Sequence, residues 1–246
     1  GVDNLGNGIW RINEFYLVNA FVLEGSERSV IIDTGCGLGD IRKVAESVTQ
    51  KPLSVLLTHM HPDHIGGIYH FRDCAVYAHG GDRGERIFGM ENNNAFRRMY
   101  VESRGSVLCP DIYMSLFSLI PEKEPDPAFS FTAIGDGYEL DLGGRRLRAI
   151  FTPGHTDGSL SFLDSQSGIL FSGDTVNCSI ILQRQENNGT ALIEKYGKTL
   201  SRLWSMNADF SSLAIGHGGP LLDKSIIADY LAMTEGLLSG SMSGSY

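Results

Sequence analysis

Three histidines and an aspartate fall within one short segment of this chain. This histidine loop, Thr58-His59-Met60-His61-Pro62-Asp63-His64, follows an apolar run from Leu53 to Leu57 that predicts a short buried strand. Three imidazoles and a carboxylate are donors that zinc and similar metals prefer. A lone histidine is more often a surface or core residue, but three of the seven histidines in the chain fall in this loop. The loop therefore predicts a metal site at the end of a strand, and its alternating residues could serve two adjacent sites.

The pattern His-x-His-x-Asp-His at the end of a strand resembles the signature of the metallo-β-lactamase-fold superfamily. This family of αββα hydrolases includes glyoxalase II-like thioesterases, lactonases, ribonuclease Z and phosphodiesterases. Five motifs in order, covering nearly the whole chain, carry the resemblance and are far more specific together than any one alone. The other four each lie at the end of an apolar run: Val30-Ile31-Ile32-Asp33-Thr34-Gly35, Thr152-Pro153-Gly154-His155-Thr156, Ser172-Gly173-Asp174-Thr175 and Ile215-Gly216-His217-Gly218.

The resemblance implies an α/β fold, a four-layer αββα sandwich with an inserted, partly helical cap. Apolar periodicity agrees with this fold, and we expect one domain over residues 1–238, followed by a flexible tail, residues 239–246. The second half is expected to start at Phe131. Predicted strands are Ile9–Ile12, Phe15–Leu23, Val30–Ile32, Tyr138–Leu142, Arg145–Phe151, Leu160–Leu163, Ile169–Phe171 and Leu213–Ile215, and predicted helices lie between Gly37 and Pro52, at Leu192–Trp204 and at Lys224–Leu238.

The stretch from Gly80 to Pro127, here called the cap, is an insertion between the two predicted halves. His64 and His155 lie 91 positions apart (155 − 64), and the intervening chain is rich in aromatic residues and arginines rather than low in complexity. Long segments in a compact domain are usually disordered or functional. We expect an ordered cap over the metal mouth, with Tyr100 contacting the substrate. The alternative is that its aromatic residues dock outside the sandwich or form a dimer contact.

The resemblance also implies a ligand set for two metal ions. It assigns His59, His61 and His155 to one metal, Asp63, His64 and His217 to the second, and Asp174 as a bridge between them. Asp33 would orient a loop histidine through its other ring nitrogen, although an Asp before Thr34-Gly35 could simply form a turn. Two divalent ions are expected. Zinc is the leading candidate and iron or manganese the alternatives, because imidazole and carboxylate accept all three.

The activity implied is that of a dinuclear metal-dependent hydrolase, in which a metal-bound hydroxide cleaves a small ester, thioester, lactone or phosphoester. Asp63 and Asp174 would be its catalytic carboxylates. The best-known dizinc β-lactamases carry Cys where this chain has Asp174, which disfavours antibiotic hydrolysis. Two alternatives stay open: a mononuclear iron oxidoreductase of the persulfide-dioxygenase type, with a His59, His155 and Asp174 triad, or a non-catalytic metal-binding homologue.

The composition of the chain limits which classes of partner we expect it to bind. The net charge of −9 and pI near 5.2 disfavour nucleic acid, and no apolar stretch approaches the roughly 20 residues that span a membrane. Four scattered cysteines favour a cytoplasmic protein with reduced thiols, although a start at Gly1 leaves a removed signal peptide open. The substrate is expected to be a small anionic molecule, because Arg184 follows Asp174 by ten residues and could hold a carboxylate or phosphate. The oligomeric state stays open, with a dimer as one alternative.

Overall fold

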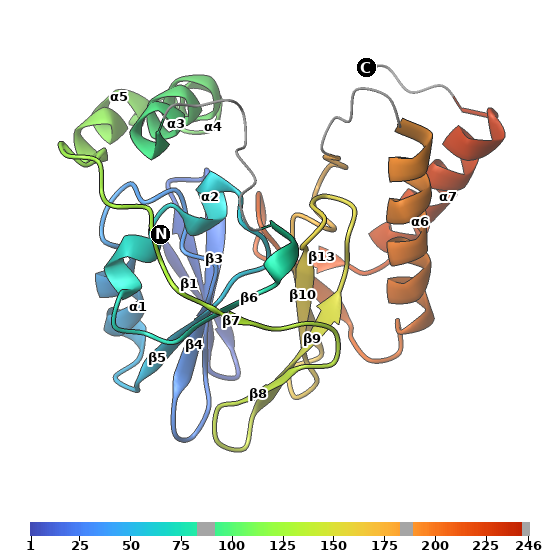
Figure 1. Ribbon diagram of the computed structural model, residues 1–246, viewed down its shortest axis with the longest axis horizontal. Coiled ribbons are helices and arrows are strands. Elements are labelled where there is room, and N and C mark those ends of the chain that lie inside the picture. Colours follow the sequence, from blue (N-terminus) through green and yellow to red (C-terminus); the bar gives the residue numbers. More distant parts are fainter. Residues whose placement is uncertain (83–91, 183–188, 243–246) are drawn as a thin grey trace.

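A computed structural model describes residues 1–82, 92–182 and 189–242 of the chain. Two β-sheets pack face to face, and helices cover the outer face of each sheet (Figure 1). The layers run helix, sheet, sheet, helix. This architecture confirms the expected αββα fold.

The first sheet has seven strands in sequence order. Its first four strands are antiparallel, and the last four, counting the shared β4, run parallel. The strands are β1 (Val2–Gly6), β2 (Ile9–Glu14), β3 (Val18–Glu24), β4 (Ser29–Ile32), β5 (Leu53–Leu56), β6 (Val76–Ala78) and β7 (Thr132–Ala133).

The second sheet has six strands in the order β13-β12-β11-β10-β9-β8. Only the β11–β12 pair is parallel. Its strands are β8 (Glu139–Asp141), β9 (Arg146–Phe151), β10 (Leu160–Asp164), β11 (Ile169–Gly173), β12 (Ser212–Ile215) and β13 (Leu222–Asp223).

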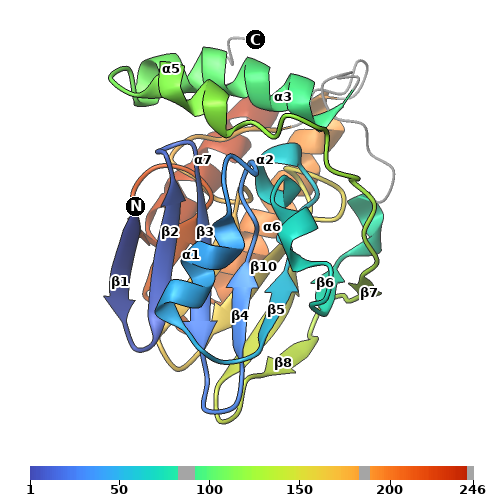
Figure 2. The same ribbon diagram turned by 90° about the vertical axis from the view of Figure 1, so that its left-hand side faces the viewer.

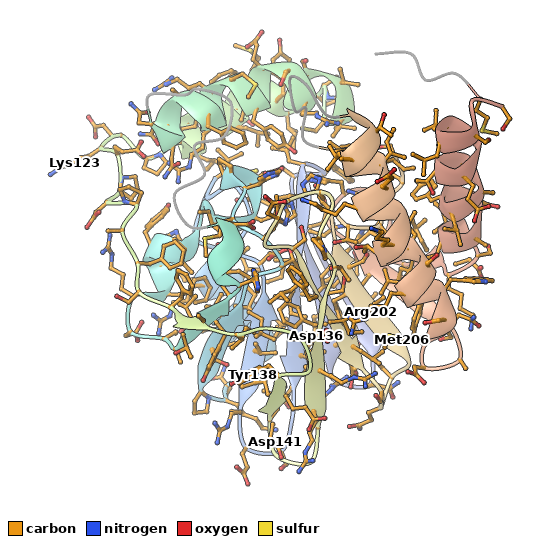
Figure 3. All side chains as sticks on the ribbon, turned by 45° about the vertical axis from the view of Figure 1, so that its right-hand side comes forward. Lys123, Asp136, Tyr138, Asp141, Arg202 and Met206 are labelled. Atoms are coloured by element: carbon orange, nitrogen blue, oxygen red, sulfur yellow. The ribbon has the colours of Figure 1, made fainter. Side chains whose placement is uncertain are left out.

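Helices close both outer faces. On the first sheet lie α1 (Ile41–Val48), α2 (Pro62–Ile65) and the 3₁₀ turn η1 (Ile68–Phe71), and on the second lie α6 (Gly189–Ser205) and α7 (Ile226–Ser239). Asp40 caps α1 by accepting a hydrogen bond from the backbone of Lys43. An ion pair between Arg202 of α6 and Asp136 fastens α6 to the loop before β8 (Figure 3).

Alternating strand residues build the layers. In β3, Phe21 and Leu23 point between the sheets, whereas Ala20 and Val22 face α1. In β10, Phe162 points between the sheets and Leu163 faces the helices of the second sheet. This is the period of two that a strand imposes on its side chains. Because both faces of each sheet are buried, the strands read as apolar runs in the sequence.

The cap lies over one end of the sandwich, above α2 (Figures 1 and 2). It is largely helical in its described part. Phe96, Tyr100, Val101 and Leu116 pack there on Leu38 of the first half, forming a fourth apolar cluster. The cap elements are η2 (Gly80–Asp82), α3 (Asn93–Tyr100), a π-helical turn η3 (Val101–Gly105), α4 (Ser106–Leu108), α5 (Tyr113–Leu116) and η4 (Phe117–Leu119).

Two expectations about the strands were wrong. The cap does not separate the two halves, because β7 (Thr132–Ala133) pairs with β6 and still belongs to the first sheet. The strand expected from Phe15 begins at Val18, since Phe15 and Tyr16 form a tight turn with φ of 54° and 66°. Such turns usually carry Asn or Gly at these positions, so the aromatic pair gave no turn signal.

Strands β1, β6 and β13 were not expected at all. The predicted helices, by contrast, all occur within a few residues of their expected ends. Ser239, expected in the tail, is the last residue of α7, and the backbone of Met242 donates to Gly236 O at 3.0 Å. Residues 243–246 of the expected flexible tail lie outside the described residues.

Candidate metal centre

The five motifs meet at one edge of the sandwich because each follows the carboxyl end of a strand. The histidine loop follows β5, and its Pro62 starts the short helix α2. The other site residues come from four different strands: Asp33 follows β4, His155 follows β9, Asp174 follows β11 and His217 follows β12. Segments up to about 200 residues apart in sequence are thus brought together by the fold.

The seven residues that the resemblance assigns as ligands form one group, here called the donor cluster, in which His217 is half-buried and the other six are buried. Within it, three sets of side chains each offer ligand atoms within 4.8 Å of one another. They are His59, His61 and His155; His59, His64 and Asp174; and Asp63, His64 and His217. The first and third sets coincide with the two metal sites that the resemblance implies, and the second set joins them.

Asp174 lies between the two sites. Its Oδ2 is 3.7 Å from Nε2 of His155 and 3.2 Å from Nε2 of His217, while its Oδ1 is 3.4 Å from Nε2 of His64. One carboxylate therefore faces nitrogens of both sets. Gly216 makes room for it, because a Cβ on that residue would lie 2.1 Å from Oδ1 of Asp174.

Backbone and carboxylate acceptors orient the histidines. Nδ1 of His155 donates to Ile181 O, and Nδ1 of His217 donates to Leu17 O, both at 2.6 Å. Since a carbonyl only accepts, each of these Nδ1 atoms carries the proton, and Nε2 is left as a donor of electrons to a metal. The Phe15-Tyr16 turn sets the position of Leu17 and so contributes to the site.

Asp33 holds the histidine loop from the first sheet. Its Oδ2 accepts from Nδ1 of His64 at 2.8 Å, and its two oxygens also accept from the backbone and hydroxyl of Thr58 at 2.8 Å each. The residue is 2% exposed and has a φ of 61°. A carboxylate behind a ligand histidine fixes the ring and its tautomer. The arrangement fits the orienting role, and the Asp33 backbone also turns in the left-handed region.

The donor cluster fits metal ions chemically. Nε2 of His59 is buried and makes no hydrogen bond, although buried polar atoms nearly always have a partner. Nδ1 of His61 and Nε2 of His155 lie 3.0 Å apart. Two nitrogens on one tetrahedral zinc at about 2.0–2.1 Å are separated by about 3.3 Å. The buried nitrogen of His59 and the convergence of imidazole and carboxylate atoms are what a metal would satisfy.

Comparison with known proteins decides the family. The family model described as the metallo-beta-lactamase superfamily matches residues 14–217, which include every residue of the donor cluster. The chain belongs to the metallo-beta-lactamase superfamily. Within this superfamily, a metallo-beta-lactamase family protein of Thermus thermophilus has the same fold, with a TM-score of 0.65 at 22% identity over 96% of this chain and 82% of that one.

The curated relatives of this superfamily chain include proteins with thioesterase names. The human protein named acyl-coenzyme A thioesterase MBLAC2 is 31% identical over 197 residues, 70% of this chain. A protein of Aspergillus fumigatus named atrochrysone carboxyl ACP thioesterase is 27% identical over 192 residues, 76% of this chain. The matches span 65% of the human protein and 47% of the fungal one.

The histidines of the donor cluster differ in the direction of their pKa shifts. Burial lowers the pKa of His59 well below its usual value and that of His61 to about 3. Burial also opposes protonation of His217, but the Asp174 and Asp63 carboxylates outweigh it and raise the pKa of His217 to about 10. The carboxylates around His64 likewise raise its pKa against the effect of burial. Without metal, neutral His59 and His61 therefore lie beside protonated His64 and His217.

A pocket of about 220 Å³ opens onto the donor cluster. One wall is the cap, and Tyr100 there donates from its phenol to Oδ2 of Asp63 at 3.0 Å. The expected substrate contact Tyr100 therefore does line the site. Arg184, the other expected contact, lies outside the described residues. The exposed Arg104 of η3 also lines this pocket and is a described cation for an anionic group.

Several supporting residues were missed in the sequence. Buried Asp82 accepts from the backbone of Met60 and from Thr156, tying the histidine loop to the motif of His155. Buried Arg97 donates to Cys36 O and Gly66 O, at 2.8 Å each, and so fastens the cap beside the histidine loop. Apolar Tyr100 and Val101, at i+3 and i+4, share its helical face and could have indicated that Arg97 is buried. No local pattern marks Asp82.

No described helix is both long and apolar enough to span a membrane.

Proposed function

We propose that the donor cluster binds two divalent metal ions, with zinc as the leading candidate, and that the protein hydrolyses acyl thioesters. His59, His61 and His155 would hold one ion, Asp63, His64 and His217 the other, and Asp174 both. The observation that carries the proposal is the position of Asp174, whose carboxylate faces nitrogens of both sets at 3.2 to 3.7 Å. The thioesterase names of two relatives favour a thioester among the substrates that such a centre could cleave.

When bound, such ions activate water at neutral pH and polarise the carbonyl oxygen of a substrate. The residues of the chain supply the rest. Asp174 and Asp63 place negative charge where the ions bind, and Asp33 holds the ring of His64 through its Nδ1. Tyr100 closes the side of the centre that faces the cap, so the reacting bond would lie in a partly dry pocket.

No activated serine or cysteine lines the described part of the pocket, so the proposed reaction has no covalent enzyme intermediate. Among the described residues, the exposed Cys178 and the other free cysteines do not line the pocket at the donor cluster. Among the described residues that line the pocket, the other hydroxyl belongs to exposed Ser103, whose Oγ contacts Sδ of Met99 and none of the described bases. A nucleophile of the Ser–His type needs the base within hydrogen-bond reach.

A substrate panel tests the proposal. Thioesters, matched oxygen esters, lactones, phosphomonoesters and bis-p-nitrophenyl phosphate would be assayed with the zinc, manganese and iron forms. We expect the highest kcat/KM on thioesters, loss of activity on chelation and recovery on adding metal back. Preferred cleavage of phosphoesters would overturn the substrate class. Oxygen consumption by an iron form with one ion per chain would instead identify an oxidoreductase.

A further inference from the structure

The wall of the pocket opposite the donor cluster comes from the cap. Phe96, Met99, Tyr100 and Ser103 line it, and their spacing of i, i+3, i+4 and i+7 puts them on one face of the continuous helix formed by α3 and η3. Arg104 continues this stripe at i+8. The cap thus presents a single helical face to the metal centre.

The upper part of this wall is apolar. Phe96 stacks on Tyr100 with ring centroids 5.1 Å apart, and Met99 packs partly on the same cluster beneath the cap. Ile181, 38% exposed, lines the same pocket from the loop after β11. The phenol of Tyr100 is already engaged with Asp63, so its ring offers carbon atoms to the pocket. A group lying along Met99 and Ile181 would meet mainly hydrocarbon.

The size of the pocket sets the scale of what it holds. A cavity of about 150 Å³ lined by apolar side chains accommodates benzene. The pocket here is about 220 Å³, which leaves room for a chain of moderate length beside the donor cluster. A polar amide arm in the same place would lose its water without finding hydrogen-bond partners, which costs about 1–3 kcal/mol for each unpaired group.

We propose that this pocket is the subsite for the acyl side of the thioester, that it takes an apolar acyl chain of moderate length, and that Met99 limits this length. The inference rests on the proposed function and adds the direction in which the substrate lies. The acyl chain runs from the donor cluster along Met99 and Ile181, and the thiol arm leaves toward solvent. Met99 suits the role because its flexible thioether fills a space of irregular shape.

The test compares substitutions at Met99 on a series of thioesters. N-acetylcysteamine thioesters from acetyl through butanoyl, hexanoyl and octanoyl to decanoyl share one neutral thiol arm, so only the acyl chain changes. For the wild-type protein, kcat/KM should rise by up to about fourfold per methylene and then level off when the pocket is full. Met99→Ala should move this plateau to longer chains, and Met99→Trp should lower kcat/KM on octanoyl about tenfold or more while acetyl changes less than about threefold.

The control is Met114→Ala, the same substitution at a methionine of the cap that is 66% exposed and does not line the pocket. It should leave the chain-length profile unchanged. The dissociation constants of non-hydrolysable S-alkyl analogues, measured by calorimetry on the same variants, give a readout independent of turnover. They should follow the same order, and circular dichroism with metal analysis would show that both Met99 variants are folded.

The outcomes separate the two proposals. If no thioester is cleaved but the analogues bind with a length dependence that Met99 variants shift, the pocket proposal stands and the thioesterase proposal fails. If thioesters are cleaved with a profile that both Met99 variants leave unchanged, the acyl chain lies elsewhere and the pocket proposal is overturned. Equal binding of all S-alkyl analogues by the wild-type protein would also overturn it.

Discussion

The phenol of Tyr100, on the cap, donates a 3.0 Å hydrogen bond to Oδ2 of Asp63, in the histidine loop. The same Oδ2 lies 3.4 Å from Nε2 of His217. The cap therefore contacts the set of Asp63, His64 and His217 directly, through an atom proposed to bind metal. A change in the position of the cap would be felt at the centre itself.

Tyr100→Phe removes this hydrogen bond and keeps the ring that stacks on Phe96. We expect metal affinity or kcat/KM to fall by about 10–100-fold, as is usual when a partner of a ligand is lost. Chelator competition and steady-state kinetics measure the two effects. Tyr113→Phe is the matched control, since Tyr113 packs in the same cap without lining the pocket. Equal affinity and activity in Tyr100→Phe and wild type would show that the bond has no functional role.

Asp33→Asn tests the support of His64 with little change of shape. Asparagine tolerates the φ of 61° at this position. Its amide, however, must turn its NH₂ group toward either the backbone N–H of Thr58 or Nδ1–H of His64, because Asp33 accepts from both. We expect a loss of about 10–100-fold in metal affinity, measured by chelator competition. Wild-type affinity would contradict the orienting role.

Arg97→Met tests how the cap is fastened. The guanidinium is 1% exposed and donates to Cys36 O and Gly66 O at 2.8 Å and to Asn94 Oδ1 at 2.7 Å. Its loss leaves buried acceptors without donors, so the free energy of unfolding should fall by about 2–4 kcal/mol in urea titration. Arg98→Met, at the exposed neighbour, should change it by less than about 0.5 kcal/mol. Equal effects of the two substitutions would show that Arg97 does not fasten the cap.

Metal affinity should rise with pH. The pKa of His217 is raised to about 10 without metal, so below that pH a metal ion must displace its proton. The raised pKa also stabilises the metal-free fold fully below the unfolded pKa of about 6.5, and this contribution is lost as the pH rises through about 10. Between pH ~7 and ~9 chelated protein should lose stability while metal binds more tightly. Calorimetry in buffers of different ionisation enthalpy would show proton release, and affinity independent of pH would contradict the argument.

The resemblance to the metallo-β-lactamase-fold signature predicted that the donor cluster would converge, and the apolar run before each motif agreed with it. Such runs predict buried strands, and polar residues at their ends predict a common edge. The contact between Tyr100 and Asp63 was not readable, because it depends on how the cap folds back over the sandwich. The aromatic residues of the cap were the one sequence feature that predicted packing against the sandwich instead of disorder.

The errors have physical causes too. Strand β7 is two exposed residues, Thr132 and Ala133, held by parallel pairing with β6, so no alternation marks it. The Phe15-Tyr16 turn adopts positive φ without Gly or Asn, held by the bond from the backbone of Tyr16 to Oδ1 of Asn13. At β7 tertiary context outweighs local preference, whereas the turn depends on a local bond from a side chain to the backbone.

The central claim is that the donor cluster holds two metal ions with Asp174 between them. Elemental analysis of protein purified without added metal, run beside Asp174→Ala, tests it most directly. We expect about two divalent ions per wild-type chain and fewer than one in the variant, because Asp174 faces nitrogens of both metal sites. One ion per wild-type chain, or wild-type metal content in Asp174→Ala, would contradict it.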